Sequence, residues 1–445
     1  MLKTIRTTIA GVAVLCLGSV ALWGQAAQPQ WKDRAEYDLV ELIKKEQNPQ
    51  AKLQLLQQWE QKYPNSDFRD GRYELMVQTY QQLGKAKEMM DTAKAWVAFN
   101  PKALTGWYWI NLLTVSMNDT SPAALEQGEK AAKALLELCD DFFNPAKKPQ
   151  QVTDEQWKQQ RAMTEYVAYR TMGWVAMERQ QYLDADKYFI EALKRNPNDA
   201  QVSAWAGRVN VRTRQLERQG IALFHFARSA VYSGPGSFPE QVRQQLLSTF
   251  EKNYINFHGS KEGMDEVIKL AQSTAIPPEG FKIESQDEIM AKQEEELKRT
   301  NPVLALWVGI KRELTSPNGP AYFENSLKNA HIPGPDGIQV GETKVTKLKG
   351  TVVSVDPPKR PKKIVLGLSS PNMSEVTLVF ENPLPVAPEP GTVLEFGGIV
   401  TEYSLEPFNL TFEVEPSDVV GLPAPKKAAP ARKAPARKAP AKAKK

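Results

Sequence analysis

The sequence is short of the residues that carry most enzyme chemistry. Its 445 residues include only three histidines and two cysteines. The histidines (His225, His258 and His331) lie too far apart in sequence to show the spacing of metal ligands. The chain also has no glycine-rich phosphate loop, no G-x-S-x-G turn and no H-E-x-x-H motif. We therefore predict a protein that is not an enzyme and that needs no metal and no cofactor.

Cysteine is also too scarce for a disulfide framework. Cys16 lies in an apolar N-terminal run, and Cys139 lies in a helical pattern farther along the chain. If the N-terminal run is removed, the single remaining cysteine has no internal partner, so packing alone must hold the fold together. We expect Cys139 to be a small, buried, apolar side chain.

The N-terminus has the pattern of a secretory signal. Lys3 and Arg6 precede an uncharged apolar run over residues 9–23, and small residues follow at Gly24 and Ala26. This arrangement predicts a cleaved signal peptide over residues 1–27 and an exported protein of the periplasm or cell envelope. The alternative is that the segment stays in place and anchors the chain in the inner membrane.

From residue 31 to residue 272 the apolar residues recur at helical spacing. Prolines at Pro64, Pro101, Pro145 and Pro197 each follow an amphipathic stretch. Because proline disfavours helical geometry in the residue before it, each marks a helix end. The pattern predicts a succession of helices with short connections.

The stretch from Tyr166 to Pro197 resembles the tetratricopeptide repeat (TPR). The markers of the repeat are Tyr169, Met172-Gly173, Ala185, Phe189, Ala192 and Pro197. Small residues let two antiparallel helices approach, and large residues fill the space opposite. The match departs from the family where Ala176 replaces a large aromatic residue. The resemblance implies an α-solenoid of helical hairpins that binds other proteins, here with four or five irregular units and a helical cap over residues 240–272.

The same resemblance identifies candidate binding residues, because the first helix of each TPR pair lines the binding groove. Arg170 and Trp174 occupy lining positions in the best repeat, and Arg208 and Arg212 occupy them in the next. Arg208 and Arg212 are four residues apart and so share one helix face. Guanidinium groups bind carboxylates in two-point geometry, so we expect an acidic peptide partner. The alternative is that these arginines form a solvated face, with or without ties to Glu178 or Glu217.

After residue 272 the pattern changes twice. Residues 273–342 read as a helical and irregular connector, which includes a buried apolar helix. Residues 343–421 contain five β-rich segments with turn residues between them, so we predict a small five-stranded β domain. The glycines Gly350, Gly397 and Gly398 suggest a small closed barrel. The strand count and the G-x-V-x-x-x-D-P opening at residues 350–357 resemble an oligonucleotide/oligosaccharide-binding (OB) barrel, and a five-stranded sandwich is the alternative.

Residues 422–445 form a tail rich in Lys, Ala and Pro, which we predict to be disordered. It carries nine cations and no acid. Without these nine and the two cations of residues 1–27, the net charge of +5 becomes about −6, so the remaining body is acidic. The tail cations are the candidate polyanion-binding residues: Lys426, Lys427, Arg432, Lys433, Arg437, Lys438, Lys442, Lys444 and Lys445.

These features predict a non-enzymatic interaction scaffold of the bacterial cell envelope. The helical repeats would bind a protein or peptide, and the tail would bind an anionic envelope polymer, lipid headgroups or nucleic acid. No small-molecule substrate is expected. The alternative function is a nucleic-acid-binding protein that uses the β domain and the tail.

Overall fold

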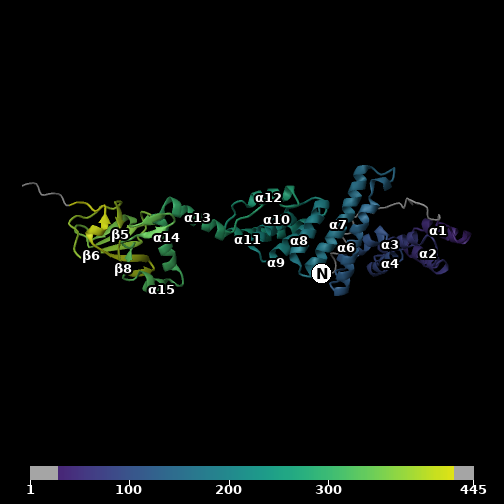
Figure 1. The fold of residues 1–445 in the computed structure, drawn as a ribbon, viewed down its shortest axis with the longest axis horizontal. Coiled ribbons are helices and arrows are strands. Elements are labelled where there is room, and N and C mark those ends of the chain that lie inside the picture. The colour runs from purple at the N-terminus through teal and green to yellow at the C-terminus, as the bar shows by residue number, and fades with distance from the viewer. Residues whose placement is uncertain (1–28, 425–445) are drawn as a thin grey trace, which may run out of the picture. The chain divides into compact units, whose positions relative to one another are not determined.

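The computed structural model describes residues 29–424 and separates into two compact units. Residues 29–286 form a helical unit, and residues 287–424 form a β unit (Figure 1). The order of the two, a helical array followed by a β domain, is as the sequence predicts. The proposed signal peptide and the nine tail cations lie outside the described residues.

The helical unit is a series of antiparallel helix pairs in which each helix packs on the next as far as the eleventh, and the twelfth packs on the tenth (Figure 1). The helices are α1 (Arg34–Lys45), α2 (Pro49–Lys62), α3 (Arg69–Gln82), α4 (Ala86–Phe99), α5 (Leu104–Met117), α6 (Pro122–Phe142), α7 (Asp154–Glu178), α8 (Tyr182–Arg195), α9 (Ala200–Arg212), α10 (Leu216–Val231), α11 (Glu240–His258) and α12 (Met264–Ser273). A short 3₁₀ turn, η1 (Pro145–Lys147), lies between α6 and α7.

Local sequence explains where these helices begin. The side chains of Asn48 and Ser121 accept hydrogen bonds from backbone N–H groups at the starts of α2 and α6. A proline follows each of them in the first turn. Thr153 and Gln156 form a reciprocal capping box at the start of α7, the longest helix. These side chains satisfy N–H groups that have no partner within the helix.

The turns inside four helix pairs share one backbone feature. A residue with positive φ follows α3, α5, α7 and α9, namely Gly84, Asn118, Gln180 and Arg214. A left-handed residue at this place ends a helix and returns the chain along it. Gln180 and Arg214 are separated by the 34 residues of one TPR unit.

Close contacts between small and large residues hold the pairs together. A Cβ built on Gly173 of α7 would lie 2.5 Å from ring carbons of Phe189 in α8. One repeat later, a Cβ on Gly207 of α9 would lie 2.7 Å from the ring of Phe226 in α10. Real Cβ atoms do not approach so closely, so only glycine permits this helix spacing. The predicted alternation of small and large residues is thus present in two successive units.

The helical unit extends beyond the predicted boundary at residue 272. Ala275 is 5% exposed and packs in the main core, while Ile283 is 6% exposed and packs with Phe250 and Tyr254 of α11. The Glu284 carbonyl also lies 2.9 Å from Nδ1 of His258. These contacts place the division between the units after Gln286, not at residue 272.

The β unit contains three helices before its main sheet, and these correct the predicted connector. They are α13 (Gln286–Thr300), α14 (Pro302–Thr315) and α15 (Gly319–Tyr322), with a π turn, η2 (Phe323–Leu327), after them. Trp307, Ile310 and Leu314 of α14 are buried in the core of the sheet. Residues 287–342 therefore belong to the β unit, because their apolar face completes its core.

Eight strands form one mixed sheet in the order β1-β8-β9-β6-β5-β4-β7-β10, with β6 and β9 parallel and the other pairs antiparallel. The strands are β1 (His331–Ile332), β4 (Leu348–Asp356), β5 (Lys363–Gly367), β6 (Val376–Phe380), β7 (Val393–Phe396), β8 (Gly398–Leu405), β9 (Phe408–Val414) and β10 (Val419–Val420). A separate hairpin joins β2 (Ile338–Val340) to β3 (Thr343–Val345), and η3 (Pro416–Asp418) precedes β10.

The predicted count of five strands is too low, for two reasons. One predicted segment is divided at Gly397 into β7 and β8, which pair with different neighbours, β4 and β9. Strands β1 and β10 are two residues each and too short to show an alternating pattern. The sheet curls, since β7 and β8 lie toward its two ends and are joined through a single residue. No helix within residues 29–424 has the length and apolar character of a membrane span.

Candidate functional site

Arg208 and Arg212 lie one turn apart on α9, and both side chains are exposed. We call this pair the α9 arginine face. Within residues 29–424, neither guanidinium has a hydrogen-bond or ion-pair partner. The ties to Glu178 or Glu217 are therefore not formed, and the exposure of both side chains agrees with a binding face and with a solvated face alike. Arg214, in the turn that follows α9, is exposed in the same way.

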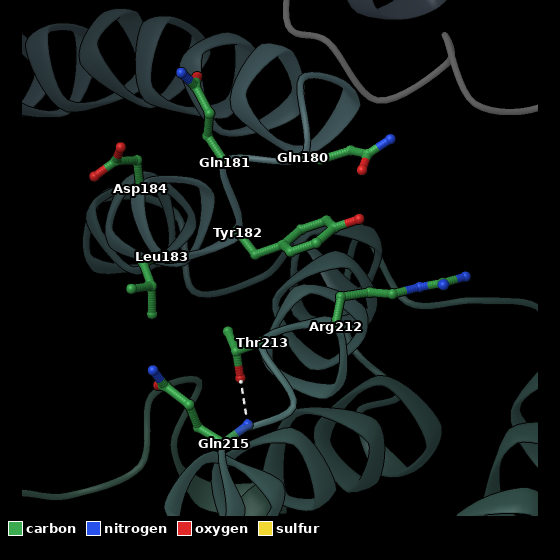
Figure 2. A pocket seen from close by; sticks show the side chains of 8 residues that line it. All are labelled: Gln180, Gln181, Tyr182, Leu183, Asp184, Arg212, Thr213 and Gln215. Carbon is green, nitrogen blue, oxygen red and sulfur yellow. Dashed lines mark hydrogen bonds between the residues drawn. The ribbon is translucent and has the colours of Figure 1, made fainter.

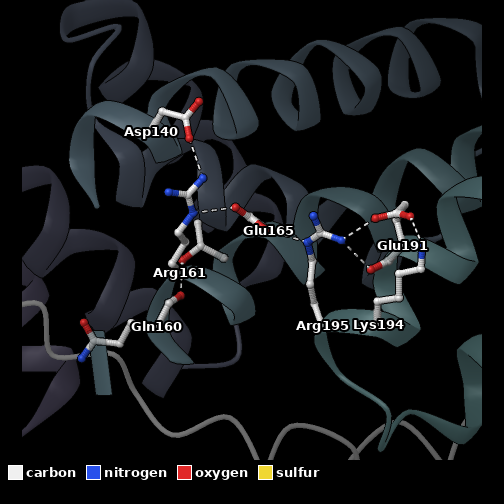
Figure 3. Close-up of polar contacts among 8 residues, drawn as sticks. Asp140, Gln160, Arg161, Glu165, Glu191, Lys194 and Arg195 are labelled. Atoms are coloured by element: carbon white, nitrogen blue, oxygen red, sulfur yellow. Dashed lines mark hydrogen bonds and ion pairs between the residues drawn. The ribbon is translucent and has the colours of Figure 1, made fainter. Parts of the chain in front are cut away.

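Other arginines of the helical unit are engaged in internal contacts, which makes the α9 arginine face distinct. Glu165 of α7 accepts a bond from Nε of Arg161 at 2.8 Å and another from Nε of Arg195 at 2.6 Å (Figure 3). Arg195 also reaches Glu191 at 2.6 Å, so this chain of ion pairs ties α8 to α7. Its geometry is that of structural cross-links between helices.

A second internal network lies directly beneath α9. Asn210 donates to Asp186 of α8 at 2.6 Å, and Arg218 of α10 donates to both Asp186 and Asn210, at 2.9 and 3.0 Å. Asn210 is fully buried and Asp186 is 8% exposed. These bonds fix α9 between α8 and α10, so the exposed arginines stand on a rigid helix.

Arg170, a predicted groove residue, is committed to a contact within the unit. Its Nε lies 3.5 Å from a carboxylate oxygen of Asp199, and its guanidinium lies over the ring of Trp205. Asp199 also caps α9 and accepts a hydrogen bond from the hydroxyl of Tyr166. Burial, together with the charge of Asp199, raises the pKa of Tyr166. Arg170 therefore links α7 to the start of α9.

Trp174, the other groove residue predicted in that repeat, is a core residue. Its side chain is 2% exposed and belongs to the main hydrophobic core of the helical unit. A buried indole cannot contact a peptide without unfolding its surroundings. The prediction of Trp174 as a lining residue is therefore wrong, because the positions that face a groove in regular repeats are covered in this irregular array.

A shallow pocket lies where two of the turns with positive φ approach each other. Eight residues line it: Gln180, Gln181, Tyr182, Leu183, Asp184, Arg212, Thr213 and Gln215. Figure 2 shows the Arg212 side chain extending on the same side as the Tyr182 ring, with Leu183 on the other side. Arg212 thus belongs both to the α9 arginine face and to the rim of this pocket.

Exposed apolar side chains accompany these cations. Leu183 is 42% exposed, Val211 41% and Leu216 55%. Leu183 lines the pocket, while Val211 and Leu216 flank the residues that form its other side. The arrangement offers cations for carboxylates and apolar contact for aliphatic side chains, which together suit an acidic, amphipathic peptide. Sequence reasoning missed Leu183 and the pocket, since two turns 34 residues apart create it.

Two residues of types that often carry enzyme chemistry, His225 and Cys139, lie in the core of the helical unit. No group of three or more His, Cys, Asp or Glu residues there is arranged to hold a metal ion. His225 is completely buried among core residues, and burial lowers its pKa to about 3. Cys139 is 1% exposed, and burial followed by the charge of Glu165 raises the pKa of its thiol to about 12. Its predicted role as a buried apolar residue is what the structure shows.

No family model and no curated protein sequence matches the chain. Among solved structures it is similar to TTC0263, a thermophilic TPR protein of Thermus thermophilus, at 15% identity over 50% of this chain and 96% of that one, with a TM-score of 0.28. It is also similar to a tetratricopeptide repeat protein from Parabacteroides merdae, at 11% identity over 54% and 99%, with a TM-score of 0.27. A MamA RS-1 ArsTM double mutant is similar at 11% identity over 49% and 97%, with a TM-score of 0.32. At these TM-scores the similarity is not evidence for the fold. The repeat architecture is assigned from the helix pairs of this chain alone.

Proposed function

We propose that the helical unit is a TPR-type scaffold whose α9 arginine face binds an acidic peptide segment of a partner protein. The carrying observation is that Arg208 and Arg212 are exposed and unpaired on a rigid helix within residues 29–424, while Arg161, Arg170, Arg195 and Arg218 are all used internally. The 34-residue spacing of Gly173 and Gly207 supports the repeat assignment.

Charge reversal tests the binding face. The double variant Arg208→Glu/Arg212→Glu should weaken binding of short fluorescent peptides rich in Glu and Leu by about tenfold or more, because guanidinium–carboxylate bonds would become repulsions. Lys130→Glu/Lys158→Glu is the matched control, since both lysines are exposed and unpaired elsewhere in the described part of the same unit. Fluorescence anisotropy of full-length protein gives the affinities. If both double variants weaken peptide binding equally, or if neither weakens it, the α9 arginine face is not the binding site.

The cell-envelope setting is part of the same proposal. Residues 1–27 have the pattern of a signal peptide, and the tail that follows residue 424 is a polycation suited to anionic headgroups or envelope polymers. Mass spectrometry of the protein from its host should find a chain lacking the first 27 residues in the periplasmic fraction. An intact N-terminus in the membrane fraction would instead favour the retained anchor.

One surface of the β unit supports the alternative function, nucleic-acid binding. The loop between β4 and β5, together with the first residue of β5, carries exposed Lys359, Arg360, Lys362 and Lys363, none of which has an ion-pair partner in residues 29–424. The strand order suits an OB-like barrel, and so does the β7–β8 run, in which β7 pairs with β4 and β8 pairs with β9. The OB barrel is a fold known to bind oligonucleotides.

Single-stranded DNA binding by full-length protein tests this alternative. Serine at all four loop positions should reduce both the affinity and its salt dependence, because fewer phosphates would be neutralised. A variant with serine at the nine tail cations separates the contribution of the loop from that of the tail. An unchanged affinity in the loop variant would dismiss the loop as a contact.

A further inference from the structure

Charge is divided along residues 364–445 into two consecutive blocks of opposite sign. Residues 364–424 contain nine Asp and Glu residues and no Lys or Arg. Residues 425–445 contain nine Lys and Arg residues and no acid. The acidic block comprises most of β5 and all of β6 to β10 with their loops, and two of its glutamates, Glu395 and Glu402, lie on the continuous β7–β8 run.

Acidic and apolar side chains alternate on the outward face of the β7–β8 run. Leu394, Phe396 and Val400 point into the core, which leaves Glu395, Ile399 and Glu402 exposed. Glu413 of β9 is exposed and lies directly across from Ile399. We call Val393, Glu395, Ile399, Glu402, Glu413 and Val420 the β7–β8 strip.

The glutamates of the strip have little to neutralise them. Glu402 and Glu413 have no ion-pair partner in residues 29–424, and the Glu395 carboxylate reaches only Lys349, at 3.9 Å. Aliphatic side chains lie beside them, with Val393 48%, Ile399 41% and Val420 53% exposed. An occupant that fits must therefore supply several cations and small apolar groups together.

The start of the tail is close to this strip. Val420 of β10 is directly opposite Glu395 of β7 in the antiparallel register. The chain leaves the sheet after Val420, and the first tail cation, Lys426, follows six positions later in the sequence. The tail consists mainly of Lys, Arg, Ala and Pro, which are the cations and small apolar groups that the strip requires.

We propose that residues 425–445 bind back onto the β7–β8 strip of the same molecule. An extended chain of 21 residues reaches about 65 Å at about 3.1 Å per residue, whereas the strip follows 12 strand residues, or about 40 Å. The tail is therefore long enough to follow the whole length of the strip. Each exposed ion pair is weak, at about 0.2–1 kcal/mol, but the covalent link raises the effective concentration to about the millimolar range.

This contact changes how the tail acts as a polyanion-binding segment. The inference rests on that part of the proposed function, because a docked tail must leave the strip before phosphates or carboxylates of an envelope polymer can bind it. The strip then works as an internal competitor that discriminates against weakly charged ligands. Added salt weakens both contacts.

A peptide titration measures the docking directly. The receptor is the full-length chain with serine at the nine tail cations, and the probe is a fluorescent peptide of residues 425–445. At low salt the peptide should bind, and Glu395→Gln/Glu402→Gln/Glu413→Gln should weaken binding by about tenfold or more. Glu126→Gln/Glu155→Gln/Glu266→Gln is the matched control, since these three glutamates are exposed and unpaired in the described helical unit. Equal affinities for the two triple variants would overturn the proposal.

Trypsin digestion of the unmodified full-length chain provides a second readout in the intact molecule. Docking should slow cleavage after the tail lysines at low salt, and the strip variant should lose this protection by about fivefold or more while the control variant keeps it. Sedimentation at several protein concentrations separates docking within one molecule from docking between copies. A mass that rises with concentration and falls in the strip variant would overturn the intramolecular form. Peptide binding at the α9 arginine face should be unaffected by any of these substitutions, so the two proposals fail separately.

Discussion

Gly173 of α7 lies so close to Phe189 of α8 that a single methyl group at Gly173 would meet the ring at 2.5 Å. The benzyl side chain is completely buried. Neither the ring nor the opposing helix can shift without disturbing the core around it. This one contact therefore sets the spacing of the helix pair that the sequence marks best as a repeat.

We predict that Gly173→Ala destabilises the helical unit by about 1–2 kcal/mol, because the overpacking cost of about 1–3 kcal/mol exceeds the helix-propensity gain of up to about 1 kcal/mol. Gly71→Ala in α3 is the control. A Cβ there meets nothing within 4 Å, so this variant should gain about 0.5–1 kcal/mol. Urea unfolding followed by circular dichroism gives both values. Stabilisation by Gly173→Ala would show that the helices separate easily.

The turn after α7 gives a prediction of opposite sign. Gln180 has φ 61°, a conformation that costs a residue with a Cβ about 1 kcal/mol relative to glycine. Gln180→Gly should therefore raise the melting temperature of the helical unit, whereas Gln181→Gly in the same turn should not. Scanning calorimetry distinguishes the two, and a fall in both variants would contradict the prediction.

The buried network beneath α9 should be costly to break. Asn210→Ala removes a donor to Asp186 and an acceptor for Arg218, so we expect a loss of about 1–3 kcal/mol in the free energy of unfolding. Gln241→Ala, at an exposed position of α11, should change it by less than about 0.5 kcal/mol. If the network orients the arginine face, Asn210→Ala should also weaken acidic peptide binding under conditions where the protein stays folded.

His225 should make the helical unit sensitive to acid. Both ring nitrogens are buried without a hydrogen-bond partner in the described part of the chain, and burial lowers the pKa to about 3. Below the unfolded pKa of about 6.5 the unfolded chain therefore binds a proton that the folded chain does not. The contribution of neutral His225 to the free energy of unfolding is fully present above about pH 6.5. It decreases by about 1.4 kcal/mol per pH unit as the pH falls toward 3.

His225→Phe tests this directly. Between pH 7 and pH 5 the wild-type protein should lose about 2 kcal/mol more than the variant, as measured by urea unfolding at each pH. The same loss in both proteins would show that groups other than His225 govern the acid response.

The outcome for the four predicted groove residues shows how far sequence reasoning reaches in this chain. The periodicity of Gly173, Phe189 and their neighbours predicts the helix pairs, because packing two helices closely demands particular residue sizes. Arg208 and Arg212 are exposed, as both the binding-face and the solvated-face interpretations predict, so their role in binding stays a prediction. It fails for Trp174, since whether a position is covered depends on neighbouring helices whose lengths differ between units.

The β unit shows the same limit in another form. Alternating patterns predict strands of four or more residues, but the two-residue β1 and β10 exist only because a neighbouring strand is there to pair with. The burial of α14 likewise depends on a sheet formed by residues after it. Such elements are set by long-range pairing, which local residue patterns do not encode.

The continuity of β7 and β8 through Gly397 also has a consequence for solubility. An unpaired strand edge is a template on which a second chain can add by backbone hydrogen bonds. In this sheet β5, β6 and β9 each have a neighbour on both sides, and the two terminal strands are two residues long. Strand β1 pairs only with Gly398 and Ile399, so the rest of β8 has β9 as its single strand neighbour. We therefore expect any edge-to-edge association of the β unit to occur along Thr401 to Leu405 of β8.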